Sequence, residues 1–320
     1  MGQLLACSRR SQLKKFADED PKSPYYAPPV DETIYIAVMG STGSGKTTFI
    51  NLASGSHLRA SSGLESCTNE VQTSSPFNVG GQQVVLIDTP GFDDTTVTDT
   101  DVLRLIAAYL VTTNKQGARL VGAIYMHRIS DLRLTGSALR DFRMFQELCG
   151  EEAYPNVLIV TNMWQNVTAE EGNERERELA TKDIFFKPIL DKHAKMLRHE
   201  NTQKSAHSII QNLVEKEPVV LQIQRELGEG MDITQTAAYK QLDKEMSELA
   251  ARHKKELEGL REEMAEAERS QDEETRNELQ EEMRKVEAEL QQAQNQSSRL
   301  GSEYQAELRR IEEMLHVKDG

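Results

Sequence analysis

One eight-residue segment of the chain has the residue types and spacing that bind phosphate. It runs from Gly40 to Thr47 and fits the pattern G-x-x-x-x-G-K-[ST]. Glycine-rich backbone of this kind presents successive N–H groups to an anion, and the N-terminus of the following helix adds partial positive charge. The lysine of such a loop contacts the β- and γ-phosphates, and the last hydroxyl is a Mg²⁺ ligand. We therefore expect Lys46 to hold phosphate and Thr47 to hold Mg²⁺.

The elements on either side are those that such a loop needs. Residues 34–39 form an apolar, β-branched run typical of a buried strand, and residues 48–52 are expected to open a helix. This order of strand, loop and helix distinguishes a phosphate-binding loop from a glycine-rich turn that matches by chance. The nucleotide-binding residues predicted here are Gly40, Ser41, Thr42, Gly43, Ser44, Gly45, Lys46, Thr47 and Thr48.

A second buried-strand pattern, at residues 84–88, ends in an acid. It continues as Asp88-Thr89-Pro90-Gly91, the D-x-x-G sequence typical of GTPases. A carboxylate at the tip of a strand can hold the Mg²⁺ shell, usually through water. Glycine permits close approach of the backbone, so the Gly91 N–H is expected to meet the γ-phosphate. Asp88 and Gly91 thus join the predicted nucleotide site.

Between these motifs, a GTPase needs a threonine in its first switch segment. The chain has S-C-T-N-E-V-Q at residues 66–72. The hydroxyl and carbonyl of that threonine contact Mg²⁺ and the γ-phosphate, and the segment relaxes when the phosphate leaves. We predict that Thr68 is this residue and that it completes a metal site with Thr47 and Asp88. Thr73 and the surrounding serines remain alternatives.

Three motifs together resemble those of the septin-related TRAFAC GTPases. They are V-M-G-S-T-G-S-G-K-T-T, S-C-T-N-E-V-Q and L-I-D-T-P-G-F. The closest resemblance is to GIMAP-type immunity-associated GTPases, whose similar S-x-T-x-x-x-Q switch supports Thr68, and to the chloroplast envelope import GTPases. More specifically, I-Y-M-H-R-I-S-D-L-R and V-T-N-M-W resemble G-domain proteins expanded in mushroom-forming fungi. The resemblance covers about residues 33–230 and implies a GTP-binding switch with Mg²⁺ as its cofactor.

The segment that should read the base departs from the usual N/T-K-x-D, whose aspartate accepts from guanine N1–H and N2–H₂. After the strand at 157–160, Asn162 replaces the lysine and Trp164 replaces the aspartate. Without that carboxylate the site loses most of its means of rejecting adenine. Thr161, Asn162 and Trp164 are predicted to contact the nucleotide. Trp164 either stacks on the base or packs in the core, and residues 198–201 are an alternative source of a base contact.

The hydrolytic machinery is incomplete as well. Phe92 stands where Ras-like GTPases place a glutamine that orients the attacking water. Hydrolysis is therefore expected to be slow, unless a second copy supplies a group as septin-like families commonly do. His127, Arg128 and Arg133 follow the strand at 121–126 and are candidates for that role. The predicted catalytic residues are Lys46, Thr68, Gly91 and Arg128. A solvated loop or a structural ion pair is the alternative for the His127-Arg128 pair.

Strands alternating with helices predict an α/β P-loop G domain, a mostly parallel sheet with helices on both faces, at residues 33–230. Helices are expected at about 98–115, 135–149 and 203–216 and from about 169, and a strand at 120–126. Residues 1–32, with a proline-rich linker, are expected to be a disordered N-terminal segment.

Residues 231–320 are predicted to form a long, charged helical tail like a coiled coil. Apolar residues recur at 4-3 spacing, from Leu242 to Ala267 and again from Leu279 to Tyr304, although the spacing is imperfect. This pattern fits a dimeric coiled coil, a hairpin folded against the G domain, or a lone charged helix.

The composition restricts the partners. With 38 Lys+Arg against 52 Asp+Glu, the net charge of −14 argues against nucleic acid, whose phosphates need a basic face. No apolar run approaches about 20 residues, no secretory signal is evident, and three unpatterned cysteines indicate a reducing compartment, so a cytoplasmic location is expected. Gly2 and Cys7 leave membrane attachment open, but Ala6 stands where lipidation favours Ser or Thr.

The leading hypothesis is a Mg²⁺-dependent GTP/GDP switch that hydrolyses GTP slowly and faster when G domains pair. Its expected partner is a second copy of the chain, through the G domain, the coiled coil or both. Two alternatives remain. One is an interaction module that binds nucleotide with negligible hydrolysis, and the other is a P-loop ATPase, because the guanine-reading aspartate is absent.

Overall fold

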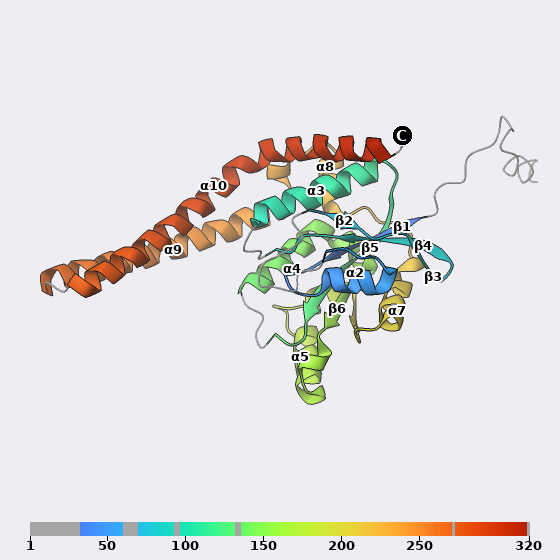
Figure 1. Cartoon of the computed structure of the whole chain (residues 1–320), viewed down its shortest axis with the longest axis horizontal. Coiled ribbons are helices and arrows are strands. Elements are labelled where there is room, and N and C mark those ends of the chain that lie inside the picture. Colours follow the sequence, from blue (N-terminus) through green and yellow to red (C-terminus); the bar gives the residue numbers. More distant parts are fainter. Residues whose placement is uncertain (1–32, 60–69, 93–96, 132–135, 271–272, 319–320) are drawn as a thin grey trace, which may run out of the picture. The chain divides into compact units, whose positions relative to one another are not determined.

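The computed structural model of the chain describes residues 33–59, 70–92, 97–131, 136–270 and 273–318. The predictions for residues 1–32, including Gly2 and Cys7, lie outside the described residues, as do those for Thr68 and Arg133. The described part folds as the expected α/β structure, with a helical C-terminal region (Figure 1).

A seven-stranded, mostly parallel sheet forms the centre of the G domain. Along the sheet the order is β2-β4-β1-β5-β6-β7, and β3 pairs with β4 off this path. The β1–β4, β1–β5, β5–β6 and β6–β7 pairs are parallel, whereas β2 and β3 run antiparallel to β4. The strands are β1 (Ile34–Met39), β2 (Gln72–Thr73), β3 (Phe77–Val79), β4 (Gln82–Asp88), β5 (Arg119–Arg128), β6 (Val157–Asn162) and β7 (Lys195–Arg198).

Both faces of the sheet are buried, which explains the continuous apolar runs of its central strands. In β1, Ile36 and Val38 belong to one apolar cluster, while Ala37 and Met39 belong to the other. This alternation follows from the two-residue period of a strand. The first cluster includes residues of α2 and α7, and the second includes residues of α3, α4 and α8.

Helices cover the sheet at the positions that the sequence predicts. The helix expected at 98–115 is α3, and its N-cap is Thr98, whose side chain accepts a hydrogen bond from the Asp101 N–H. The sequence analysis did not anticipate β2, β3, β7 or α8. The helices are α2 (Lys46–Ser54), α3 (Asp99–Lys115), α4 (Gly136–Cys149), α5 (Ala169–Thr181), α6 (Lys187–Leu190), α7 (Gln203–Val214), α8 (Gln222–Gly228), α9 (Ala237–Ser270) and α10 (Glu273–Lys318).

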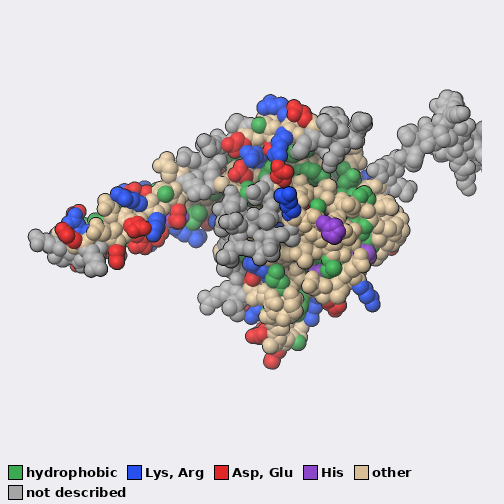
Figure 2. All heavy atoms as spheres, viewed as in Figure 1, with side chains coloured by type: hydrophobic (Ala, Val, Ile, Leu, Met, Phe, Trp, Pro, Cys, Tyr) green, Lys and Arg blue, Asp and Glu red, His purple; other side chains and the backbone are tan. Residues whose placement is uncertain are grey.

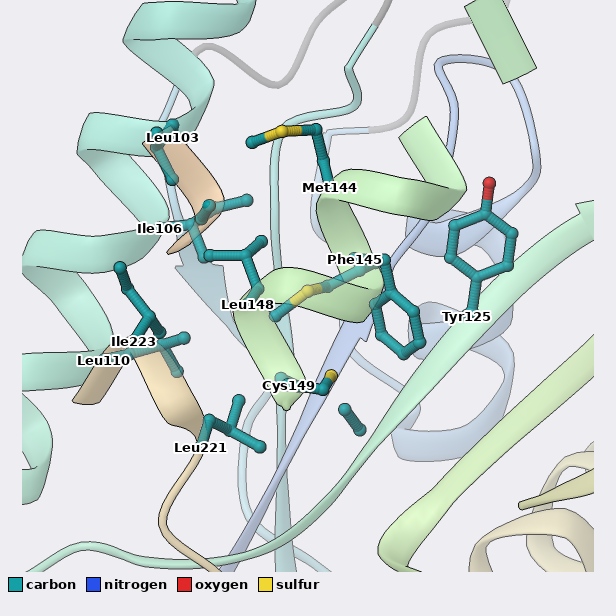
Figure 3. Packing of buried hydrophobic residues seen from close by; sticks show 14 of the residues in the cluster. Leu103, Ile106, Leu110, Tyr125, Met144, Phe145, Leu148, Cys149, Leu221 and Ile223 are labelled. Carbon is teal, nitrogen blue, oxygen red and sulfur yellow. The ribbon is translucent and has the colours of Figure 1, made fainter. Parts of the chain in front are cut away.

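The larger apolar cluster lies where α3, α4 and α8 meet (Figure 3). Leu103, Ile106 and Leu110 of α3 face Phe145 and Leu148 of α4. Each of these side chains is at most 1% exposed, so the cluster fixes α3 and α4 as rigid elements beside the sheet.

The tail forms a helical hairpin in which α9 and α10 pack side by side (Figure 1). Towards its turn they share a small apolar cluster of their own, made by Leu257, Leu260, Ala267, Leu279 and Val286. The space-filling view shows Lys and Arg interspersed with Asp and Glu along this part (Figure 2). Of the three arrangements that fit the sequence, the structure has the intramolecular hairpin.

The second half of α10 returns to the G domain and packs along α3. Leu300, Tyr304 and Ile311 are at most 4% exposed and belong to the same apolar cluster as α3 and α4. The tail therefore shares a core with the sheet, and the boundary expected between residues 230 and 231 stays a prediction. None of the helices in the described segments is long and apolar enough to cross a membrane.

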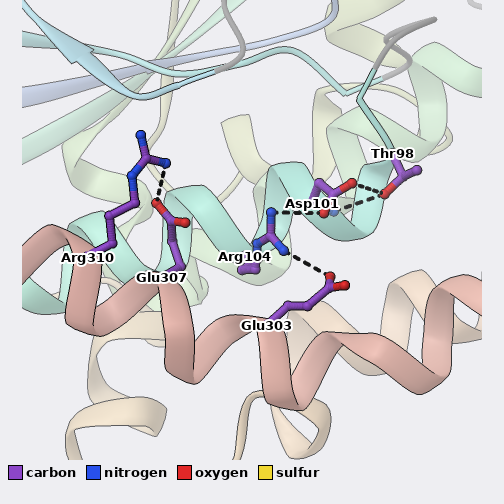
Figure 4. A network of polar contacts seen from close by, with 6 residues as sticks. All are labelled: Thr98, Asp101, Arg104, Glu303, Glu307 and Arg310. Carbon is purple, nitrogen blue, oxygen red and sulfur yellow. Dashed lines mark hydrogen bonds and ion pairs between the residues drawn. The ribbon is translucent and has the colours of Figure 1, made fainter.

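A polar network borders this contact (Figure 4). Arg104 of α3 lies 3.0 Å from Asp101 and 2.9 Å from Glu303 of α10. Further along α10, Arg310 contacts Glu307 at 3.5 Å and also forms an ion pair with Glu70. Glu70 directly follows the segment that contains Thr68, so α10 contacts α3 and also the chain just after that segment.

Candidate nucleotide-binding site

The phosphate-binding pattern lies in the loop between β1 and α2, as predicted. α2 begins at Lys46, and Gly45 caps it with φ 92°. A Cβ on Gly45 would lie 2.5 Å from the side-chain nitrogen of Asn162, so both the backbone conformation and the packing require glycine. The loop is thus held between the N-terminus of α2 and the end of β6.

The Lys46 ammonium lies across this loop. Its Nζ donates to the carbonyl oxygens of Gly40 at 2.8 Å and Ser41 at 3.1 Å, and the side chain is only 7% exposed. The positive charge is thereby held against two backbone carbonyls at the start of α2, where the helix N-terminus also favours an anion such as phosphate. Thr48, also predicted here, is exposed on the first turn of α2.

Two of the three predicted metal ligands lie in contact. The Thr47 hydroxyl donates to Asp88 Oδ2 at 2.6 Å, which joins the first turn of α2 to the end of β4. Asp88 is fully buried, and burial raises the pKa of its carboxyl, against the hydrogen bond from Thr47 and the charge of Lys46.

The donor set fits a divalent cation. Asp88 Oδ1 and the Ser44 hydroxyl are buried and lack hydrogen-bond partners in the described part of the chain. A buried carboxylate oxygen without a donor is suited to a cation or to one of its water ligands. The described residues include no cluster of three or more His, Cys, Asp or Glu, so a cation here would depend on Thr47, Asp88, water and phosphate.

Gly91 packs directly against the phosphate loop. A Cβ on Gly91 would lie 2.5 Å from the backbone nitrogen of Thr42, and the Thr42 N–H donates to the Phe92 carbonyl at 3.2 Å. The Phe92 side chain is 2% exposed and belongs to the apolar core. Phe92 therefore has a packing role, in agreement with the prediction that it cannot orient water.

Asn162 connects the base segment to the phosphate loop. Its side-chain nitrogen donates to the Ser44 carbonyl at 3.3 Å, and its side-chain oxygen accepts from the Met163 N–H at 2.7 Å. If Asn162 takes the first position of N/T-K-x-D, the fourth falls on Gln165, one residue later than the sequence analysis placed it. Gln165 is exposed, and an amide replaces the carboxylate there.

Trp164 is held by several contacts. Its Nε1–H lies 3.2 Å from the Thr161 carbonyl oxygen and 3.1 Å from Oγ1 of the same residue. The Arg198 guanidinium covers one face at 4.1 Å from the ring centre, and Gly172 packs so closely that a Cβ would meet the ring at 2.6 Å. These contacts favour the packing alternative for Trp164 over stacking on a base.

Arg128 lies beside its own phosphate loop. Its Nη1 is 3.2 Å from the point where a Cβ on Gly43 would lie, and its Nε is 3.0 Å from Asp131. The structural ion pair, the alternative to a catalytic role, is therefore present. The side chain remains 36% exposed, so the guanidinium is also accessible from outside.

Two histidines near the strand ends are buried. His127 is the penultimate residue of β5 and lies beside Phe186, and His199 follows β7 with its ring edge on Phe49. Burial lowers the pKa of each to about 4. His199 lies in the segment proposed as an alternative base contact, but its Nδ1 pairs with the Ser205 hydroxyl at 2.9 Å, and its ring is 1% exposed.

These histidines predict a loss of stability in mild acid. Their folded pKa values lie below the ordinary 6.5, so the unfolded chain takes up protons at these positions before the folded chain does. The free energy of unfolding is therefore unaffected by them above pH 6.5 and decreases as pH falls towards 4. A shift of this size corresponds to about 3 kcal/mol per histidine. Urea unfolding between pH 7.5 and 4.5 should show the decline, with a smaller slope in His199→Gln. If the free energy of unfolding of His199→Gln declines with pH as steeply as that of wild type, the lowered pKa of His199 is not a source of the acid instability.

One contact of the loop has no counterpart in the sequence motifs. The Ser41 hydroxyl donates to the carboxylate of Asp141, a residue of α4 that is 1% exposed. The two residues are 100 positions apart, and neither periodicity nor spacing singles out Asp141.

Comparison with known proteins agrees with this geometry. Residues 35–141, about a third of the chain, match the family model described as 50S ribosome-binding GTPase. Comparison with curated protein sequences gives no significant match. Similar solved structures include Toc33 from Arabidopsis thaliana in complex with Mg²⁺ and GMPPNP, at 17% identity over 58% of this chain and 87% of that one, with a TM-score of 0.46.

Era from Aquifex aeolicus, as a single-residue variant bound to GDP and AlF4⁻, is similar at 14% identity. That match covers 59% of this chain and 58% of the other, with a TM-score of 0.41. The phosphate loop, the D-x-x-G strand end and the matched family model agree on one conclusion. This chain contains a nucleotide-binding P-loop G domain of the GTPase kind.

Proposed function

We propose that the protein is a Mg²⁺-dependent GTP-binding switch with slow GTP hydrolysis. The observation that carries this proposal is the Thr47–Asp88 hydrogen bond at 2.6 Å, with an unpartnered buried oxygen of Asp88 beside the Lys46 ammonium. Lys46 holds the β- and γ-phosphates, and Thr47, Thr68 and Asp88 hold Mg²⁺ directly or through water. The cation supplies charge compensation for the phosphates.

The D-x-x-G segment senses the γ-phosphate in this proposal. Gly91 touches Thr42 of the phosphate loop, so an added γ-phosphate competes for the same space and displaces or reorders the segment. Thr68 is ordered by the same phosphate and by Mg²⁺.

The helical hairpin reports the nucleotide state. α10 packs on α3, which follows the D-x-x-G segment, and Arg310 pairs with Glu70, which follows the Thr68 segment. A rearrangement of either segment therefore alters the support of α10. The finer resemblance to septin-related, GIMAP-type GTPases fits such a switch, and pairing of two G domains is part of the proposal.

Hydrolysis depends on pairing, because Phe92 is buried and offers no hydrogen bond to water. Arg128 is the group that a second copy supplies, and its accessible guanidinium supports this role. An arginine that a second copy places at the γ-phosphate stabilises the charge of the transition state.

Arg128→Ala is expected to abolish the rise of turnover per site with protein concentration. A trans-acting arginine contributes about 10³- to 10⁵-fold in rate in known cases, so the paired rate should fall at least about tenfold. Phosphate release measured across a range of protein concentrations tests this, with Arg177→Ala on α5 as an exposed control. A concentration dependence that survives in Arg128→Ala would contradict the role.

The residues expected to contact the base allow adenine as well as guanine. Residues 161–166 contain no carboxylate, and an amide such as Gln165 pairs with adenine as readily as with guanine. A P-loop ATPase is therefore the second candidate function. Guanine preference would need a carboxylate from elsewhere, and Glu200, in the loop after β7, is the candidate.

Titration calorimetry with Mg²⁺ tests the proposed function. GDP, a non-hydrolysable GTP analogue, ADP and an ATP analogue are compared on the same full chain. A guanine preference of tenfold or more supports the GTP switch. Equal or adenine-favouring affinities support the ATPase alternative, and no binding of any nucleotide overturns both.

A further inference from the structure

The second residue of the phosphate loop is anchored from outside the loop. Ser41 donates its hydroxyl to Asp141 Oδ2, and its carbonyl accepts from Lys46 Nζ at 3.1 Å. One residue thus connects a carboxylate on α4 with the lysine that is expected to hold phosphate. Any change in the orientation of Ser41 would displace the carbonyl that positions Lys46.

The anchor is rigid. Phe142, Phe145 and Leu148 of α4 are at most 2% exposed and pack in the large apolar cluster, which fixes the helix that carries Asp141. A hydrogen bond to an ionised carboxylate is about twice as strong as one between neutral groups. The contact is also shielded from water, since Asp141 is 1% exposed.

A negative charge beside a phosphate loop is by itself unfavourable for an anionic ligand. Its influence on the surroundings is visible at Tyr125, where burial first and the Asp141 charge second raise the pKa of the hydroxyl well above its ordinary value. The Tyr125 hydroxyl points away from the apolar cluster (Figure 3), and its interaction with the Ser41 side chain lowers its pKa against these two effects. An acid at this position therefore needs a role that outweighs its charge.

We propose that Asp141 is a positioning residue for the phosphate loop: it fixes Ser41, and through Ser41 the conformation in which Lys46 meets the nucleotide. This inference rests on the proposed nucleotide-binding function. It assigns the role to the hydrogen bond and not to the charge of Asp141, so the two contributions are separable by substitution.

A double-mutant cycle on the full chain tests this inference. Affinities for GDP and a non-hydrolysable GTP analogue are measured with Mg²⁺ for Ser41→Ala, Asp141→Ala and the double variant. Each single substitution is expected to weaken binding about tenfold, the size of one lost hydrogen bond to a charged group. The double variant should bind nucleotide about as tightly as the single variant with the lower affinity, because each single substitution already removes the same contact.

Two further variants separate positioning from a general loss of structure. Asp141→Asn keeps an acceptor for Ser41 and removes the charge, so its affinity should stay within about threefold of wild type. Thr112→Val removes a buried hydroxyl of α3 that has no hydrogen-bond partner in the described part of the chain, and it should bind as wild type does. Ser41→Ala loses only a hydroxyl from a half-buried site and keeps the test valid if Asp141→Ala does not fold.

Three results would overturn the inference. They are additive losses of affinity in the double variant, unchanged affinity in Ser41→Ala, and an equal loss of affinity in Asp141→Asn and Asp141→Ala. A wild-type chain that binds no nucleotide would overturn the proposed function and the inference together. Wild-type binding with unchanged variants would overturn the inference alone.

Discussion

Asp88→Asn is expected to weaken binding of Mg²⁺-nucleotide by about 10- to 100-fold, the usual cost of losing a group that orients a metal or its water. The same variant should lose most of its response to Mg²⁺. The reason is that Asp88 Oδ1 is the buried oxygen without a donor, while Oδ2 already accepts from Thr47. An amide at this position removes the negative charge that the cation needs and can place an N–H towards it.

The pH dependence of Mg²⁺-nucleotide binding is expected to follow from the same Asp88 carboxylate. Burial raises the pKa of Asp88, so its protonated form is reached at a higher pH than for an exposed aspartate. Mg²⁺ requires the ionised form, and the wild-type response to Mg²⁺ should therefore weaken as the pH is lowered, at a higher pH than for an exposed aspartate. The amide introduced by Asp88→Asn does not titrate, so the variant should show no such decline from this position.

Calorimetry with excess Mg²⁺ and with a chelator measures both effects. Asp183→Asn is the matched control, since it makes the same change in an exposed side chain whose recorded ion pair is with Lys187 at 3.1 Å. Thermal unfolding without nucleotide checks that Asp88→Asn is folded. A variant that binds Mg²⁺-nucleotide as tightly as wild type would refute the assignment of the metal site.

Much of this site was predictable because its signals are local. The phosphate loop occupies consecutive residues between a strand and a helix, and the D-x-x-G motif begins at Asp88, the last residue of β4. Each of these elements carries its own hydrophobic period and its own turn residues. The central strands and the helices α3, α4 and α7 were predictable for the same reason.

What the sequence did not reveal depends on contacts between distant segments. The hydrogen bond from Ser41 to Asp141 spans 100 residues, and a lone aspartate on a helix has the same appearance whether it anchors a loop or faces water. β2 and β3 have two and three residues, too few for a period to be recognised. The alternative alignment of the base segment, with its fourth position on Gln165 in place of Trp164, is suggested only by the contact of Asn162 with Ser44.

The helical tail shows a different limit of prediction from sequence. A heptad-like seam indicates that one face of a helix is buried, but it does not identify the partner. In α10 the same seam contacts α9 near the turn, and at Leu300 and Tyr304 it joins the cluster that contains α3. In that cluster α10 packs against α3 as well as against Ala238 and Leu242 of α9, and the spacing slips near Tyr304, where this second partner is added.

Tyr304→Asp is expected to release the second half of α10 from α3. Tyr304 is 3% exposed within the apolar cluster, and burying a carboxylate there without a partner costs several kcal/mol. The α9–α10 pairing near the turn has its own apolar cluster and should persist. Hydrogen exchange should therefore rise at least about tenfold in α3 and in the second half of α10, while the cluster around Leu257 and Val286 stays protected.

The nucleotide response of this variant tests the proposed link between the hairpin and the switch segments. Docked α10 holds Glu70 through Arg310 and α3 through Glu303, in the arrangement in which Gly91 lies against Thr42. In the proposed switch a γ-phosphate requires that arrangement to change, so release of α10 should raise the affinity for a GTP analogue relative to GDP, by about threefold or more. Gln305→Asp introduces the same side chain at the next, exposed position of α10 and should leave both the exchange and the affinity ratio unchanged. If Tyr304→Asp detaches α10 but leaves the ratio at its wild-type value, the hairpin is a structural support of the G domain and does not report its nucleotide.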